Sequence, residues 1–130
     1  MKSVLYPILA VFMFALFAVP IYGEPSDKNI MSRTAEVDGV QLRYLTAGHG
    51  PTVILLHGYA ETSRMWKPII PLLAEKSTVI APDLPGIGDS AIPPNGLDMK
   101  TSASRIHELV RSLGVEKAGV VGHDIGLMVA

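Results

Sequence analysis

The sequence predicts an α/β fold in which a β-hairpin opens the sheet and parallel strands then alternate with helices. The first observation is that several apolar runs are continuous instead of alternating, which indicates strands covered on both faces. The second is that segments with apolar residues at helical spacing separate these runs. With 130 residues the chain can form one small domain, which we place at residues 33–130.

The N-terminal stretch has the layout of a secretory signal peptide. No charged residue occurs between Ser3 and Gly23, and an apolar core follows the single positive charge of Lys2. We therefore expect residues 1–23 to be a signal peptide and the protein to be secreted or periplasmic. A turn-rich linker is expected to follow at residues 24–32.

An uncleaved leader is the alternative, because about 20 apolar residues can span a bilayer. In that case residues 4–22 would anchor the protein in the membrane. Pro7 and Pro20 interrupt the apolar helix and therefore favour the signal peptide.

The composition excludes several classes of function. The chain has no cysteine, which excludes disulfides and thiolate metal sites within it. Its formal net charge is −1, without a basic patch or a run of like charges, so we expect no nucleic-acid partner. We also expect neither a cofactor nor a bound metal.

Strands are predicted at five places. The opening hairpin consists of residues 33–37 and 40–45, joined by Asp38-Gly39. That dipeptide suits a type I′ turn because both central positions need positive φ. The remaining strands are continuous apolar runs at residues 52–56, 78–81 and 118–121.

Helices are predicted between these strands. The first presents four apolar residues on one face, with two prolines making its start irregular: Met65, Ile69, Leu72 and Leu73, with Pro68 and Pro71. The second spans residues 98–114, with Asp98 or Thr101 as its cap and Gly114 at its end. Its apolar stripe consists of Ile106, Leu109, Val110 and Leu113.

The strongest chemical signal follows the last predicted strand. The segment Gly122-His123-Asp124-Ile125-Gly126 has the form G-x-D-x-G and precedes a helix that starts near Leu127. Glycines at both ends permit a turn so tight that larger side chains would clash. The turn would lift Asp124 above the sheet, towards the positive end of the helix. An acidic helix cap is the alternative for this short pattern.

Two further loops follow the carboxyl ends of predicted strands, where ligands bind in such sheets. One begins with His57-Gly58 and continues through Tyr59 to Thr62. The other begins at Asp83 and contains Gly86, Gly88 and Ser90 in a D-x-x-G-x-G-x-S pattern. This second loop leads into Pro93-Pro94 and not into a helix, so it is not a dinucleotide fingerprint. We expect a loop ordered by hydrogen bonds between Asp83 and the backbone.

These three motifs, in this order, resemble the α/β-hydrolase superfamily and in particular its epoxide hydrolase and dehalogenase branch. The resemblance covers residues 37–130 and implies the N-terminal part of that fold, ending just after the nucleophile elbow. It implies that Asp124 is the nucleophile and that the backbone N–H groups of Tyr59 and Ile125 form the oxyanion hole. Structural roles at the site are implied for His57, Gly58, Gly122, His123, Gly126 and Asp83.

One position departs from the family pattern. Many relatives carry proline at the second position after the HG pair, where this chain has Ala60. The loop is therefore expected to be less rigid than in those relatives.

An aspartate at the elbow narrows the reaction. A carboxylate with a pKa near 4 is already ionised at neutral pH and needs no base to attack. Its attack on an acyl carbon would give a mixed anhydride, whereas its attack on an sp³ carbon gives an ordinary ester. The expected substrate is therefore a small-molecule epoxide or halogenated compound, with Asp124 forming a covalent ester that a His-activated water then hydrolyses.

Ile125 favours the epoxide. Haloalkane dehalogenases typically carry Trp after the nucleophile and fluoroacetate-type dehalogenases Arg, and Ile125 can bind neither halide nor carboxylate. A haloacid or haloalkane dehalogenase remains the alternative. His123-Asp124 also resembles a metal phosphohydrolase pair, but His107 alone supplies no further ligand set.

The resemblance also implies parts that this chain does not contain. These are an acidic partner, a His base, and a cap domain whose tyrosines act as acids on the epoxide oxygen. We therefore expect the 130-residue chain alone to be a truncated, catalytically inactive fragment or a binding module. Substrate identity would depend on the cap, and a homodimer is a possible state of the full-length protein.

Overall fold

A computed structural model describes residues 29–130 of the chain. The predicted signal peptide at residues 1–23 and most of the predicted linker lie outside this described part. Within residues 29–130, no helix has both the length and the apolar character needed to cross a membrane.

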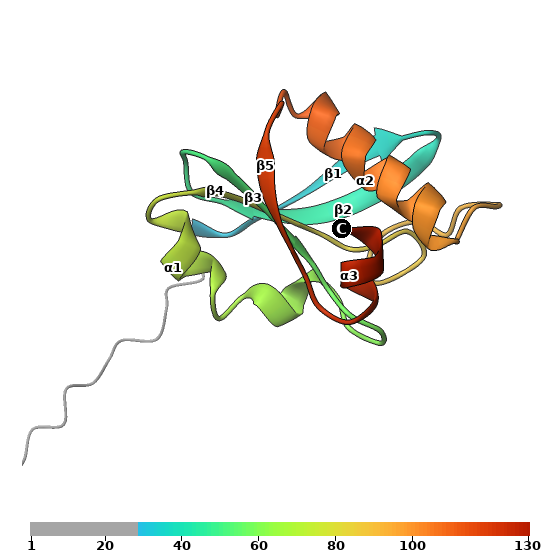
Figure 1. Cartoon of the computed structure of the whole chain (residues 1–130), viewed down its shortest axis with the longest axis horizontal. Coiled ribbons are helices and arrows are strands. Elements are labelled where there is room, and N and C mark those ends of the chain that lie inside the picture. The colour runs from blue at the N-terminus through green and yellow to red at the C-terminus, as the bar shows by residue number, and fades with distance from the viewer. Residues whose placement is uncertain (1–28) are drawn as a thin grey trace, which may run out of the picture.

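Five strands form one mixed sheet (Figure 1). Its strand order is β1-β2-β4-β3-β5, with β1 antiparallel to β2 and β2 antiparallel to β4. Strands β4 and β5 both pair with β3 in parallel. The bounds are β1 (Met31–Val37), β2 (Val40–Ala47), β3 (Thr52–Leu56), β4 (Thr78–Pro82) and β5 (Ala118–Gly122). The predicted fold class is confirmed: an opening hairpin, then parallel strands.

The hairpin turn has the predicted backbone. Asp38 and Gly39 both have positive φ, 50° and 69°, as a type I′ turn requires. Strand β1 begins at Met31, two residues before the predicted start at Arg33, because its ladder with β2 continues to Met31 opposite Thr46. The end of the predicted linker is therefore part of the sheet.

Helices cover both faces of the sheet (Figure 1). They are the 3₁₀ helix η2 (Ser63–Trp66) and the α-helices α1 (Ile70–Ala74), α2 (Met99–Ser112) and α3 (Ile125–Val129). Ile54 and Leu56 of β3 belong to the apolar cluster that also holds α2 and α3 residues. Leu55, between them, belongs to the opposite cluster with Ile70 of α1. Both faces of β3 are thus buried, which explains its continuous apolar run.

The first predicted helix is wrong in detail. The chain forms two short helices, η2 and α1, because Pro68 and Pro71 lack the N–H groups that one continuous helix needs. The predicted apolar face is consequently displaced. Ile70 is fully buried, whereas Leu72, assigned to the core from spacing, is 63% exposed.

Helix α2 matches its prediction closely. The Asp98 side chain accepts a hydrogen bond from the Thr101 N–H at 2.9 Å and is the cap. Ile106, Leu109 and Val110 of the predicted stripe are buried in the core below it, whereas its fourth member, Leu113, is 38% exposed. Gly114, with φ 78°, follows the helix and ends it.

Strand β5 is less buried than predicted. It pairs only with β3 among the described residues, and Val120 and Val121 are 44% and 46% exposed. The helix after it also starts earlier than predicted, at Ile125 instead of near Leu127. The turn between strand and helix therefore spans only His123 and Asp124.

Candidate active site

The site lies where β3, β4 and β5 end at the same edge of the sheet. Strand β3 continues into His57, β4 into Asp83 and β5 into His123. The His123 N–H donates to the Leu56 carbonyl at 3.0 Å, so the elbow begins as a continuation of the sheet ladder. Parallel strands thus bring together three loops that are far apart in the sequence.

Asp124 occupies the elbow with a strained backbone. Its φ is 51° and its ψ −119°, a conformation that non-glycine residues rarely adopt. The neighbouring glycines permit it: a Cβ on Gly122 would lie 2.6 Å from the Gly126 carbonyl carbon, and one on Gly126 would overlap the Leu56 carbonyl oxygen. The glycines are needed because backbone packs directly on backbone here.

Two backbone amides hold the Asp124 carboxylate. The Tyr59 N–H donates to its Oδ2 at 2.8 Å, and the Ile125 N–H also donates to the side chain. These two hydrogen bonds, the Tyr59 bond first, hold the pKa of Asp124 below its ordinary value, with a smaller contribution from nearby His123. The residue is solvent-exposed. The structure therefore brings together the three residues that the resemblance assigned to nucleophile and oxyanion hole.

The HG loop contacts the elbow through a second carboxylate. Glu61 Oε2 accepts from the Gly58 N–H at 3.1 Å and lies 3.1 Å from His123 Nδ1. There is no room for a larger residue at Gly58, because an added Cβ would lie 2.7 Å from His123 Nδ1. Sequence reasoning missed Glu61. The available signal was its position three residues after Gly58, from which a carboxylate can accept the Gly58 N–H within the same turn.

The backbone of the HG loop is strained at Ala60. Ala60 has φ 56°, a value that the proline of many relatives could not adopt because its ring fixes φ near −65°. Proline could therefore replace Ala60 in this chain only if the local backbone of the loop changed.

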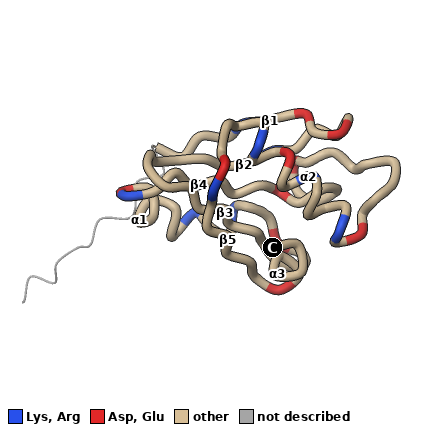
Figure 2. Tube along the Cα trace, turned by 45° about the horizontal axis from the view of Figure 1, so that its top comes forward, with Lys and Arg blue, Asp and Glu red and all other residues tan. Residues whose placement is uncertain are grey.

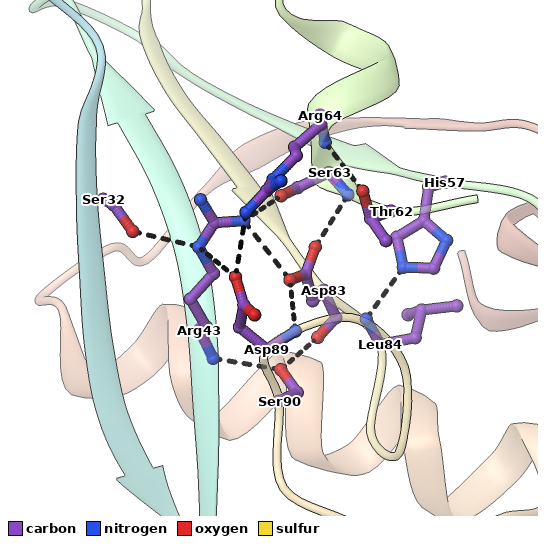
Figure 3. A network of polar contacts seen from close by, with 10 residues as sticks. All are labelled: Ser32, Arg43, His57, Thr62, Ser63, Arg64, Asp83, Leu84, Asp89 and Ser90. Carbon is purple, nitrogen blue, oxygen red and sulfur yellow. Dashed lines mark hydrogen bonds and ion pairs between the residues drawn. The ribbon is translucent and has the colours of Figure 1, made fainter.

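His57 is fully buried and bonded at both ring nitrogens. Its Nε2 accepts from the Leu84 N–H at 3.0 Å (Figure 3). Its Nδ1 lies 2.9 Å from the Gly58 carbonyl oxygen. A backbone N–H can only donate and a carbonyl can only accept, so the ring carries its proton on Nδ1. The side chain thus connects the loop after β4 with the HG loop.

Asp83 is the centre of a buried polar network (Figure 3). It accepts from the Ser63 N–H at 2.7 Å, from the Asp89 N–H at 3.0 Å and from the Arg43 guanidinium at 3.3 Å. Burial alone would raise the pKa of Asp83, but the hydrogen bonds from Asp89 and Ser63 and the charge of Arg43 together lower it. The Asp-to-backbone interactions expected for this loop are present.

Arg43 was not identified from the sequence. Its guanidinium donates to Ser32 in β1, to Ser63 in η2 and to Asp83, so this side chain connects β2 with β1, with η2 and with the loop after β4. A charged residue between Leu42 and Tyr44 in a predicted strand was the signal, since such a residue is buried only when it is paired.

Charged residues of both signs are spread over the described part of the chain (Figure 2). Within residues 29–130, no three His, Asp or Glu side chains gather in a way that could hold a metal ion. A cavity of about 210 Å³ lies between α2, α3 and β5, lined by Leu56, Ile106 and Val110 among others, and not around the Asp124 carboxylate.

Comparison with known proteins defines the class. A family described as alpha/beta hydrolase fold matches residues 51–130. A soluble epoxide hydrolase from Corynebacterium sp. (strain C12) is 48% identical over 101 residues, which is 78% of this chain and 35% of that protein. A fluoroacetate dehalogenase from Burkholderia sp. is 38% identical over 99 residues, covering 72% of this chain and 33% of that protein.

Solved structures agree with these relatives. The crystal structure of an epoxide hydrolase from Vigna radiata superposes with a TM-score of 0.76 at 34% identity, covering 80% of this chain and 35% of that one. The chain belongs to the α/β-hydrolase family, in the branch that contains epoxide hydrolases and dehalogenases. It spans about a third of the length of the relatives it matches.

Proposed function

We propose that this chain is the nucleophile-bearing part of an epoxide hydrolase, with Asp124 forming a covalent ester with the substrate. The observation that supports this role is the 2.8 Å hydrogen bond from the Tyr59 N–H to the Asp124 carboxylate at a strained elbow. The amide keeps the carboxylate ionised and aligned without burying it. The similarity to an epoxide hydrolase at 48% identity supports the choice of substrate class.

The first step is nucleophilic substitution at carbon. One Asp124 oxygen bonds to a ring carbon of the epoxide while the bond from that carbon to the ring oxygen breaks. The ring oxygen gains a proton from an acid, which the family resemblance assigns to cap tyrosines. The product is a hydroxyalkyl ester of Asp124.

The second step is hydrolysis of this ester. Water attacks the Asp124 carbonyl carbon, and the developing oxyanion takes the position near the Tyr59 and Ile125 N–H groups. Collapse of the tetrahedral intermediate releases a diol and restores the carboxylate. This step needs a His base. The acidic partner and base implied by the resemblance are not assigned to any residue of the 130.

Isotope labelling tests the covalent step. The complete gene product, of whatever length its reading frame encodes, is mixed in excess with an epoxide such as styrene oxide in H₂¹⁸O. A single turnover through the ester leaves ¹⁸O in the peptide that contains Asp124 and none in the diol. Direct attack by water leaves ¹⁸O in the diol and contradicts the proposal.

Dehalogenation is the second candidate, supported by the similarity to a fluoroacetate dehalogenase. The same Asp124 ester would form with loss of halide instead of ring opening. Release of fluoride or chloride from haloacetates, measured beside diol formation from epoxides, distinguishes the two. Faster halide release than diol formation would reverse our assignment.

Export is a further part of the proposal. The charge-free apolar stretch after Lys2 supports cleavage near Gly23 and secretion or periplasmic residence. N-terminal sequencing of the protein from the native host is the test. A mature chain starting at Glu24 supports export with cleavage, and a retained Met1 in the membrane fraction supports the anchor.

A further inference from the structure

One peptide unit connects the nucleophile to the buried interior. The peptide between Gly58 and Tyr59 donates its N–H to Asp124 Oδ2 at 2.8 Å. The carbonyl of the same peptide lies 2.9 Å from His57 Nδ1. Because a peptide unit is planar and its C=O and N–H point in opposite directions, fixing the carbonyl also fixes the direction of the N–H.

Other contacts hold this peptide less firmly. The Tyr59 side chain is 76% exposed and anchors nothing in the core. The Glu61 N–H reaches the Gly58 carbonyl at 3.3 Å, but Glu61 belongs to the same surface loop. Gly58 has no side chain, and Ala60 has a backbone conformation with φ 56° that is costly for alanine. His57 is thus the fully buried side chain that ties this peptide to the rest of the fold.

The opposite nitrogen of His57 is fixed as well. The Leu84 N–H donates to Nε2 at 3.0 Å (Figure 3). This leaves Nδ1 as the protonated nitrogen, and Nδ1 faces the Gly58 carbonyl. Leu84 follows Asp83, whose carboxylate is held by Ser63, Asp89 and Arg43. The imidazole therefore connects this buried network to the HG loop and fixes the loop relative to it.

We propose that His57 is a positioning residue, which sets the orientation of the Gly58–Tyr59 peptide so that its N–H is directed at the Asp124 carboxylate. The inference rests on the proposed function, since the same N–H would stabilise the oxyanion during ester hydrolysis. His57 takes no part in proton transfer. Its effect on the reaction passes entirely through the Tyr59 N–H, and its polarisation of the peptide strengthens that donor.

Two substitutions separate the two bonds of His57. In His57→Asn the side-chain NH₂ can occupy the place of Nδ1 and keep the bond to the Gly58 carbonyl, while the Leu84 contact is lost. In His57→Gln the side-chain oxygen can occupy the place of Nε2 and keep the Leu84 contact, while the donor to Gly58 is lost. His57→Asn leaves the Leu84 N–H without its partner, whereas in His57→Gln the Gly58 carbonyl keeps its 3.3 Å contact with the Glu61 N–H. His57→Gln is therefore expected to lose no more stability than His57→Asn.

The measurement is made on the complete gene product by NMR and rapid-quench kinetics. We expect His57→Gln to lose the coupling across the hydrogen bond between the Tyr59 nitrogen and the Asp124 carboxyl carbon. Ester hydrolysis should slow about 10²-fold in this variant, the scale of a misplaced oxyanion donor. His57→Asn should retain the coupling and the rate. Equal couplings and equal rates in the two variants would overturn the proposal.

A measurement on the unsubstituted protein covers the case in which neither variant folds. Nitrogen chemical shifts of the His57 ring should show a proton on Nδ1 and none on Nε2. A proton on Nε2 would contradict the proposed orientation. These NMR results are independent of turnover, so absence of epoxide hydrolysis would count against the proposed function without deciding the role of His57.

Discussion

Asp83 and Asp124 are two aspartates at the same edge of the sheet with different environments. Both follow a strand, both accept backbone N–H groups, and both have a pKa below the ordinary value. Asp83 is fully buried and faces the Arg43 guanidinium at 3.3 Å, whereas Asp124 is exposed and has only backbone amides and a nearby histidine.

The difference shows how surroundings decide what a carboxylate can do. A buried carboxylate must be saturated with partners, and a saturated one is closed to substrate. An exposed carboxylate needs only enough hydrogen bonds to remain ionised and oriented. Asp83 therefore stabilises the loops, and Asp124 remains accessible for chemistry. The same substitution at the two positions should separate stability from activity.

The largest effect is expected for Asp124→Ala on activity. Loss of the nucleophile should reduce the epoxide hydrolysis of the complete gene product by about 10⁴-fold or more. Thermal unfolding should remain close to that of the unsubstituted protein, because the side chain is exposed. Diol formation and circular dichroism measure the two quantities. Retention of most of the activity would remove Asp124 from the mechanism.

Asp83→Ala should have the opposite profile. Removing this carboxylate leaves Arg43 buried without its partner and should lower the free energy of unfolding by about 3 to 5 kcal/mol. Urea denaturation followed by Trp66 fluorescence gives this value. A loss below about 1 kcal/mol, the range of a surface pair, would show that the network contributes little to folding.

Glycine substitutions test the packing of the elbow. Gly126→Ala places a Cβ against the Leu56 and His57 carbonyls and should cost about 1 to 3 kcal/mol of stability. Gly119→Ala, in the strand β5 that leads into the elbow, is the control, since nothing lies within 4 Å of its added Cβ. Equal changes at the two positions would contradict the close backbone contact at the elbow.

Low pH should weaken the Asp83 network. The pKa of Asp83 is lower in the folded state than its unfolded value of about 3.9, so its stabilising effect is complete above that value. The effect is lost as pH falls through the folded pKa, because protonation favours the unfolded chain. The stability difference between the unsubstituted protein and Asp83→Asn, measured from pH 7 down to pH 3, should shrink only below about pH 4. A constant difference over this range would contradict the shift.

Arg64→Ala should have the smallest effect. Arg64 and Asp89 approach to 3.4 Å, but their side chains are 64% and 60% exposed. Exposed pairs contribute about 0.5 kcal/mol, so the free energy of unfolding should hardly change. Arg43→Ala, in the same network but buried, is the contrasting variant. Comparable losses at Arg43 and Arg64 would show that burial does not govern these ion pairs.

Local patterns predicted much of the fold. The hairpin turn at Asp38-Gly39 and the cap at Asp98 depend on φ preferences and nearby hydrogen bonds, which the sequence carries directly. The face of the helix near Ile70 was mispredicted because two prolines break its periodicity. The exposure of Val120 was mispredicted because a strand at the edge of a sheet and one at its centre can have the same apolar sequence pattern.

The sequence by itself determined the order of elements, the family and the residues at the elbow, because glycine spacing and apolar period are local properties. Only the tertiary structure decided which distant groups meet. The Arg43–Asp83 pair, the Glu61–His123 contact and the bond between His57 and the Leu84 N–H join residues from different strands and loops. Such pairings depend on strand order and loop path, and no short window of sequence contains both partners.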